Sequence, residues 1–156
     1  MQDTINRLRA KKDDEGFTLI ELLVVVVIIG VLVAIAVPVY LNYRQGAADK
    51  SAQSDVRGAV SAIEQWYTDN GNKYPTGPIA NQQASFSLDT PASATKHITL
   101  SDNTTMSYVT TTVSGTAGSY KICATNSGGT GKVYLYDSAA GGSVKAANIQ
   151  IGTCAP

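Results

Sequence analysis

The sequence predicts an α+β protein in which one long N-terminal helix packs on a C-terminal antiparallel sheet of four to five strands. The first half holds a long apolar run followed by helical periodicity, and the second half alternates like strands between Gly- and Ser-rich breaks. Each element has one apolar face, and packing them together buries both faces. We divide the chain into four regions: 1–16, 17–41, 42–69 and 70–156.

Residues 1–16 predict a short, charged, polar leader ahead of the helix. The whole chain has 156 residues, of which 44% are hydrophobic and 15% charged, with twelve basic and twelve acidic side chains. This composition is too apolar for a disordered chain and lacks the basic surplus of a nucleic-acid binder. We therefore expect a folded domain and no nucleic-acid partner.

Residues 17–41 predict a membrane-spanning helix. No charged residue occurs from Leu22 to Leu41, and at about 1.5 Å per residue this stretch crosses a hydrocarbon core of about 30 Å. Basic residues precede the span within the range that sets orientation: Arg7, Arg9, Lys11 and Lys12. The N-terminus is therefore expected in the cytoplasm and the C-terminal domain outside.

Residues 42–69 predict an amphipathic continuation of the same helix. Apolar residues recur every three or four positions and make one stripe: Ala52, Val56, Ala59, Val60, Ile63 and Trp66 or Tyr67. Asp55, Arg57 and Glu64 fall off this stripe. Asn70-Gly71 ends the helix, which from residue 17 to 69 would be about 80 Å long.

The remainder, 70–156, predicts a loop followed by a meandering sheet. Residues 76–95 are rich in Ser, Ala and Gln and contain Pro78 and Pro91, so we expect no strand there. Alternating segments separated by Gly-rich breaks predict strands at 97–101, 105–113, 119–125, 132–137 and 143–151. Cys123 and Cys154 are expected to pair, as cysteines in exported domains do, although two buried free thiols remain an alternative.

The chain offers little catalytic chemistry. His97 is the single histidine and opens a predicted strand, so a surface role is expected. The stretch 126–133 partly matches a phosphate-binding loop, but it begins with Asn126 and places Val133 where Ser or Thr should follow the Lys. We expect a hairpin turn there. No catalytic residue, metal site or cofactor is predicted.

The most informative residues surround a lone carboxylate, Glu21, at the start of the apolar run. The segment Gly16-Phe17-Thr18-Leu19-Ile20-Glu21 resembles the processing site of type IV pilin precursors. The resemblance is detailed over about residues 15–45 and extends to further positions of that family: Gly30, Pro38, Tyr40 and Tyr43.

The resemblance implies that a prepilin peptidase cuts between Gly16 and Phe17 and that the new Phe17 amine is N-methylated. It also implies assembly of the mature subunits into a filament through their N-terminal helices. The family shares a long helix, an antiparallel sheet and a C-terminal disulfide loop. Acidic residues at 13–15 replace the more usual basic ones, as in pilins of some Gram-positive bacteria.

Cleavage would give Glu21 a partner. The Phe17 nitrogen is an amide before the cut and a cationic amine afterwards, and two such charges about 4 Å apart attract by roughly 4 kcal/mol at an intermediate dielectric. The pair would form within one chain, four residues apart, or between neighbouring subunits at a fixed axial offset. A third interpretation is that Glu21 extends to the lipid headgroups.

Gly30 and Pro38 lie inside the predicted helix. Relative to Ala they cost about 1 and 3 kcal/mol respectively, and Pro38 cannot donate to the carbonyl of Ala34, so a bend or loosened turn is expected. In the resembled family this stretch becomes partly non-helical on assembly. The alternative is that membrane helices tolerate both residues.

The sequence thus predicts a structural subunit of a type IV pilus and no enzyme. Its expected partners are itself, the peptidase, the assembly machinery in the membrane and, before assembly, lipid. It would start as a single-pass protein of the cytoplasmic membrane and end in an extracellular filament. The alternatives are a pseudopilin of a secretion system, a minor pilin, or a secreted binding module cut after Ala36 in Ala34-Ile35-Ala36.

Overall fold

The computed structural model describes residues 16–88, 97–113 and 116–156, with the backbone alone at 112–113 and 116–117. These residues form one helix, α2 (Leu19–Asp69), and a set of strands: β1 (Ile79–Gln82), β2 (Phe86–Ser87), β3 (His97–Ile98), β4 (Thr104–Val113), β5 (Thr116–Asn126), β6 (Val133–Asp137) and β7 (Lys145–Ala147). The chain divides into two compact units, 1–40 and 41–156. The predicted leader lies outside the described residues except for Gly16.

The N-terminal unit consists of the first part of α2. Its large apolar side chains are all solvent-exposed, from Phe17 at 82% to Val37 at 49% and Tyr40 at 63%. By length and composition α2 can cross a membrane, and none of its most apolar window is buried within the protein. The helix is continuous through Pro38, and the loosened turn expected near that residue on assembly stays a prediction.

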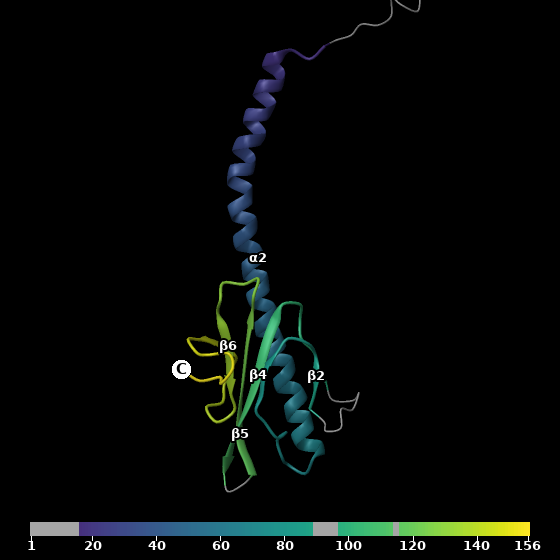
Figure 1. The fold of residues 1–156 in the computed structure, drawn as a ribbon, viewed down its shortest axis with the longest axis vertical. Helices are drawn as coiled ribbons and strands as arrows, with labels where there is room; N and C mark the ends of the chain where they lie inside the picture. The colour runs from purple at the N-terminus through teal and green to yellow at the C-terminus, as the bar shows by residue number, and fades with distance from the viewer. Residues whose placement is uncertain (1–15, 89–96, 114–115) are drawn as a thin grey trace, which may run out of the picture. The chain divides into compact units, whose positions relative to one another are not determined.

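The C-terminal unit is an antiparallel sheet of five strands in the order β1-β4-β5-β6-β7, with the second part of α2 on one face (Figure 1). The strands β4 to β7 form a meander, and β1 adds to the free edge of β4. Strands β2 and β3 form a separate two-stranded sheet. The predicted α+β class and strand number are confirmed.

The core lies between the helix and the sheet. On α2 the predicted stripe is buried at Ala52, Val56, Ala59 and Ile63. Alternate residues of the central strands face it, as the two-residue period of a strand requires: Met106, Tyr108, Tyr120, Ile122, Ala124 and Tyr134. Burying a side chain such as Ile63 contributes about 1.5–3 kcal/mol. The helix then ends at Asp69, as predicted, where Gly71 and Asn72 adopt positive φ values of 64° and 60°.

Three strand predictions need correction. The segment 76–95 was expected to be loop, but it contains β1, which pairs with β4, and β2. The strand expected at 97–101 is only β3 and belongs to the small sheet, and that expected at 143–151 is only β7. The edge position explains the first error: a bulge between Ile79 and Gln82 breaks the alternation on which the prediction relied.

The placement of Asp55 off the buried stripe was also wrong. Asp55 is only 9% exposed, and Asp49, earlier on the same helix, only 5%. Each carboxylate accepts two hydrogen bonds from a loop. Ser101 donates its backbone nitrogen and its hydroxyl to Asp55, both at 2.9 Å. A buried carboxylate is tolerated where such donors satisfy it.

The C-terminal segment covers the opposite face of the sheet. Cys123, on β5, points away from the helix because its neighbours Ile122 and Ala124 point toward it. It is bonded to Cys154 with 5.5 Å between the Cα atoms, so the predicted disulfide is confirmed. Both cysteines are buried, and Cys154 Sγ lies 3.4 Å from the carbonyl oxygen of Ser107 on β4.

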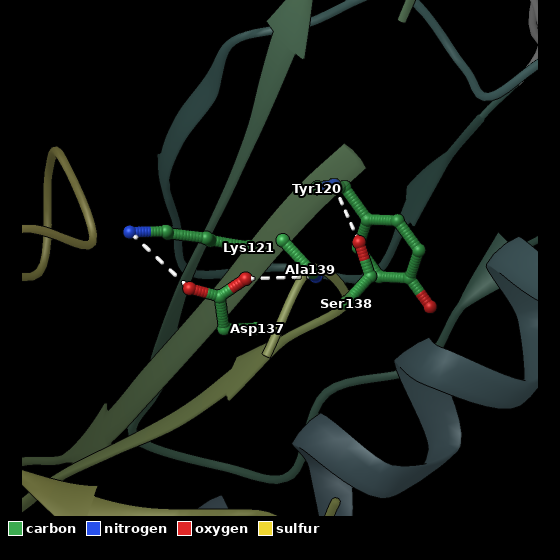
Figure 2. Close-up of polar contacts among 5 residues, drawn as sticks. All are labelled: Tyr120, Lys121, Asp137, Ser138 and Ala139. Carbon is green, nitrogen blue, oxygen red and sulfur yellow. Dashed lines mark hydrogen bonds and ion pairs between the residues drawn. The ribbon is translucent and has the colours of Figure 1, made fainter. Parts of the chain in front are cut away.

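The end of β6 is tied to β5 by side chains (Figure 2). Lys121 and Asp137 are directly opposite each other in the ladder and form an ion pair at 3.4 Å. The second Asp137 oxygen accepts a hydrogen bond from the Ala139 nitrogen at 3.0 Å and so starts the turn. Ser138 Oγ accepts one from the Tyr120 nitrogen at 2.8 Å, which extends the pairing by one residue.

Candidate functional site

The first turn of α2 is closed by a reciprocal pair of side chains. Thr18 donates its backbone nitrogen and its Oγ1 to Oε2 of Glu21, at 2.8 Å and 2.7 Å. In return the Glu21 nitrogen donates to Thr18 Oγ1 at 3.3 Å. This is a capping box, in which an N-cap Thr and a Glu three residues later satisfy each other's backbone nitrogens.

Thr18 was predicted only as part of the motif, and its capping role was missed. The signal was present, because Thr18-x-x-Glu21 directly before an apolar run is the sequence pattern of a capping box. The consequence concerns the carboxylate: both Thr18 donors use Oε2, and Oε1 accepts no hydrogen bond from the described residues. One oxygen of Glu21 thus serves its own helix and the other is open to a donor from outside.

Phe17 and Glu21 lie together on the helix surface. They form, with Ile20, Val24 and Val25, the lining of an open groove of about 420 Å³. Phe17 is 82% exposed. In this uncut chain the Phe17 nitrogen is a peptide amide, and among the described residues it makes no hydrogen bond to Glu21. The groove is apolar apart from that carboxylate.

The other residues predicted for processing and assembly are Gly16, Gly30 and Pro38. A Cβ added at Gly16 or at Gly30 would meet nothing within 4 Å, so the fold of the single chain does not require glycine at either position. Pro38 is exposed on α2. Their roles in processing and assembly remain predictions.

The C-terminal unit contains a chain of tyrosine rings. Tyr74 and Tyr120 have ring centroids 4.8 Å apart, and Tyr108 and Tyr136 lie 5.9 Å and 5.8 Å from Tyr120. The Tyr120 hydroxyl donates to Glu64 Oε1 at 2.5 Å. Burial is the larger cause and this hydrogen bond the smaller one of a pKa of Tyr120 raised well above its usual value, so the phenol stays protonated in mild alkali.

The other candidate functional residues of the sequence lie in a surface strand and a turn. His97 is exposed on β3, opposite Ser87, as a surface strand residue would be. The Gly-rich stretch after Asn126 is the turn between β5 and β6, as predicted, with Gly131 at a φ of 80°. Within residues 16–88, 97–113 and 116–156 no three His, Cys, Asp or Glu side chains are grouped to hold a metal ion.

An exposed apolar helix with a capped carboxylate at its start, followed by a disulfide-closed α+β unit, defines the pilin-like class of proteins. Residues 11–37 match the family described as "Prokaryotic N-terminal methylation motif". The chain is 37% identical over 122 residues to the "Type IV wide pilus major component PilA4" of Thermus thermophilus, covering 76% of this chain and 79% of that protein. The chain therefore belongs to the type IV pilin family.

Other relatives share a shorter part. The "Type II secretion system core protein G" of Aeromonas hydrophila is 38% identical over 66 residues, 42% of this chain and 46% of that protein. A "Type IV major pilin protein PilE1" of Neisseria gonorrhoeae is 41% identical over 61 residues, 39% of this chain and 36% of that protein. The chain thus spans less than half the length of these two relatives. No solved structure matches the chain significantly.

Proposed function

We propose that the protein is a structural subunit of a type IV pilus, made as a precursor, cut between Gly16 and Phe17, N-methylated at Phe17 and assembled through α2. The observation that carries this proposal is the joint placement of Phe17 and Glu21 at the start of an exposed apolar helix. The match to the methylation motif spans this junction.

The relatives favour a pilus subunit over a pseudopilin. A match of 122 residues is longer than the leader and helix together, so the likeness to the Thermus pilus component includes the sheet domain. The matches to two secretion-system proteins extend over 66 and 69 residues. A pseudopilin of a type II secretion system is the second candidate, because those two relatives are similarly identical over the shorter stretch, at 38% and 39%.

Assembly would use the charge that cleavage creates. The freed Phe17 amine carries a positive charge, and methylation keeps it. Glu21 of a neighbouring subunit would accept it in the dry interior of a filament, where an ion pair is stronger than in water. The exposed Leu, Val and Ile side chains of α2 would pack against those of other copies, exchanging lipid for protein.

The remaining parts of the proposal follow from this role. The precursor spans the cytoplasmic membrane once, with residues 1–16 inside and the sheet domain outside, and the mature subunit becomes part of an extracellular filament. Its partners are copies of itself, a prepilin peptidase and assembly proteins in the membrane. The role is structural, not enzymatic, which the names of the relatives support. The acidic leader as a sign of a Gram-positive host stays a prediction.

Mass spectrometry and electron microscopy of surface filaments test the function. We expect the major filament protein to be this chain beginning at Phe17, with about 14 Da added to its N-terminus by one methyl group. A Gly16→Leu precursor should stay uncut, because a side chain there obstructs close approach of the peptidase. An exported protein that begins at Val37 would show that the chain is a secreted module. Absence from filaments, with presence in a secretion complex, would favour the pseudopilin.

A further inference from the structure

We propose that Tyr43 and Arg44 bind the headgroup of an anionic phospholipid, in the leaflet on the C-terminal side of the span, and so fix the height of the unassembled subunit. This inference rests on the proposed function, because it needs α2 to cross the membrane before assembly. Residues 42–45, which directly follow the apolar run, form a polar collar around the helix. The collar is the proposed lipid site.

Arg44 is the single charged residue between Glu21 and Asp49. The positions one helical turn before and after it hold no acidic residue: Tyr40, Leu41, Ala47 and Ala48. Asp49 is buried and accepts its hydrogen bonds from Thr130. In the part of the chain that the structure describes, Arg44 makes no ion pair. Its guanidinium is therefore free to pair with an external anion, and phosphate oxygens match its two parallel N–H donors.

The collar is open on all sides among the described residues. Every residue from 41 to 47 is exposed, whereas Ala48 is half-buried and Asp49 buried, so the helix meets the sheet only beyond the collar. Tyr43 is 77% exposed although it is a large aromatic residue. A tyrosine combines an apolar ring with a hydroxyl, and this combination places Tyr at membrane–water interfaces. The collar thus joins an interfacial anchor to an unpaired cation.

The length of the apolar run puts the collar at headgroup depth. Residues 22–41 fill a hydrocarbon core of about 30 Å, and the headgroup layer on each side adds about 5–7 Å. Arg44 follows the end of this run by three residues, or about 4.5 Å along a helix. Side chains of a helix lean toward its N-terminus, which is the direction of the core. The guanidinium and the Tyr43 hydroxyl therefore reach the phosphate and glycerol groups of lipids.

An anionic headgroup fits this charge better than a zwitterionic one. A zwitterionic lipid carries a cation of its own beside the phosphate, and this cation repels the unpaired Arg44. A phosphatidylglycerol headgroup has a phosphate and neutral hydroxyls instead. The side-chain amides of Asn42 and Gln45, on either side of the tyrosine and the arginine, can donate to and accept from such hydroxyls. The collar thus suits a glycerophospholipid with one net negative charge.

Two basic residues further along α2 provide matched controls. Lys50 and Arg57 are also exposed, but they follow the apolar run by nine and sixteen residues, about 14 and 24 Å, which is beyond the headgroup layer. Lys50 also donates to Gln53 Oε1 at 3.3 Å. Arg44→Gln removes the charge of the collar, Arg44→Lys keeps the charge, and Tyr43→Ala removes the aromatic anchor. Lys50→Gln and Arg57→Gln remove a charge of the same helix outside the site.

Photolabelling from the lipid headgroup measures the contact. The full-length chain is reconstituted in nanodiscs of phosphatidylcholine with a small fraction of phosphatidylglycerol that carries a diazirine on its headgroup, and labelled residues are mapped by mass spectrometry. The basic residues on the other side of the span serve as the internal reference: Arg7, Arg9, Lys11 and Lys12. Relative to them, Arg44→Gln should lose about fivefold of the collar label, the factor that corresponds to about 1 kcal/mol for one basic residue at an anionic surface. Tyr43→Ala should lose a smaller part, and Arg44→Lys and both controls should keep the label.

Several results would overturn the proposal. Arg44→Gln could keep the full collar label, or Arg44→Lys could lose as much as Arg44→Gln. A phosphatidylcholine with the same diazirine could label the collar equally well. Loss of the label on adding excess inorganic phosphate at constant ionic strength would identify a site for free anions instead of lipid. A second arm, with the diazirine on the acyl chain, should label residues 22–41. If those residues take no label, α2 does not span the membrane and the proposed precursor fails. If they are labelled and the collar is indifferent to its charge, only this inference fails.

Discussion

Thr130 donates two hydrogen bonds to the buried carboxylate of Asp49, one from its backbone nitrogen to Oδ1 at 3.0 Å and one from Oγ1 to Oδ2 at 2.5 Å. The bonds attach the turn between β5 and β6 to α2. Ser101 and Asp55 make the same arrangement further along the helix. Two loops of the sheet domain are thus fixed to the helix by carboxylates for which no basic partner occurs among the residues that the structure describes.

Replacing Asp49 should destabilise the sheet domain. Asp49→Ala leaves the Thr130 nitrogen and hydroxyl without their acceptor, which costs about 2–3 kcal/mol. Denaturant unfolding of the full-length protein in detergent, followed by circular dichroism, measures the loss. Asp102→Ala is the control, because Asp102 is exposed. Equal stability of the two variants would show that the buried hydrogen bonds contribute nothing.

Replacing each of two glycines by alanine should change the stability of the protein in opposite directions. A Cβ at Gly129 would lie 2.2 Å from Asp49 Oδ1, so Gly129→Ala must displace the carboxylate or the turn and should destabilise by about 1–3 kcal/mol. Gly58 lies in the middle of α2 with nothing within 4 Å of an added Cβ. Gly58→Ala should stabilise by about 0.5–1 kcal/mol. The same unfolding experiment compares them, and a shift of equal sign in both would contradict the geometry.

The sheet domain should lose stability in alkali. Burial raises the pKa of Tyr74, Tyr108, Tyr120 and Tyr134, so the folded protein keeps these phenols protonated at pH values where the unfolded chain ionises them. The stabilisation is complete below the unfolded pKa of about 10 and declines as pH rises above it, by about 1.4 kcal/mol per pH unit for each tyrosine.

Denaturant midpoints between about pH 8 and 11.5 test this expectation. Tyr120→Phe should make the free energy of unfolding decline less steeply with pH, because one ionisable phenol is removed. It should also lower stability at neutral pH, because Glu64 loses its donor. Tyr43→Phe, whose ring is 77% exposed, is the control and should follow wild type. If stability declines with the same slope in all three proteins, groups other than Tyr120, such as lysines, cause the decline.

Removal of the disulfide should weaken the domain without abolishing its fold. Cys123 and Cys154 are 31 residues apart, and a bridge over that distance stabilises by about 3–4 kcal/mol in the chain-entropy model. The Cys123→Ala, Cys154→Ala double variant should unfold at correspondingly lower denaturant. Thiol titration of the unfolded, unreduced wild type provides a check on the bridge: two reactive thiols per chain would refute it.

The sequence predicted those elements whose pattern is long and regular. The helix was predicted from its periodicity and from the stop at Asn70-Gly71, and β4, β5 and β6 from their alternation and turns. Strand β1 was missed because an edge strand of four residues with a bulge carries almost no periodic signal. Its partner, β4, lies more than twenty residues away, and only the tertiary structure brings them together.

The site shows the same division. The positions of Gly16, Phe17 and Glu21 were evident as a motif, and their roles in processing and assembly remain predictions. The hydrogen bonds of Thr18 could have been predicted from the spacing Thr18-x-x-Glu21, but only the carboxylate of Glu21 was given a role. The burial of Asp49 and Asp55 was not predictable, because their donors come from loops 81 and 46 residues away in the sequence, respectively.

Glu21 should be needed for assembly but not for membrane insertion or cleavage. Insertion should not need this carboxylate, since a charged group in a membrane helix costs free energy. Cleavage should proceed too, because the cut bond lies four residues away. Assembly should fail or slow in Glu21→Ala, because the pairing of up to a few kcal/mol with the neighbouring amine is lost at every added subunit.

Glu21→Gln separates charge from shape, since it keeps the size and an acceptor oxygen that can still serve Thr18. The measurement is filament yield per processed subunit for wild type, Glu21→Ala and Glu21→Gln at equal membrane levels. We expect both variants to be deficient. Because the Gln amide can preserve the capping box, a deficient Gln variant would identify the missing charge as the cause. If Glu21→Gln assembles and Glu21→Ala fails, the contact is a neutral hydrogen bond and not an ion pair. Wild-type yield from both variants would show that Glu21 has no part in assembly.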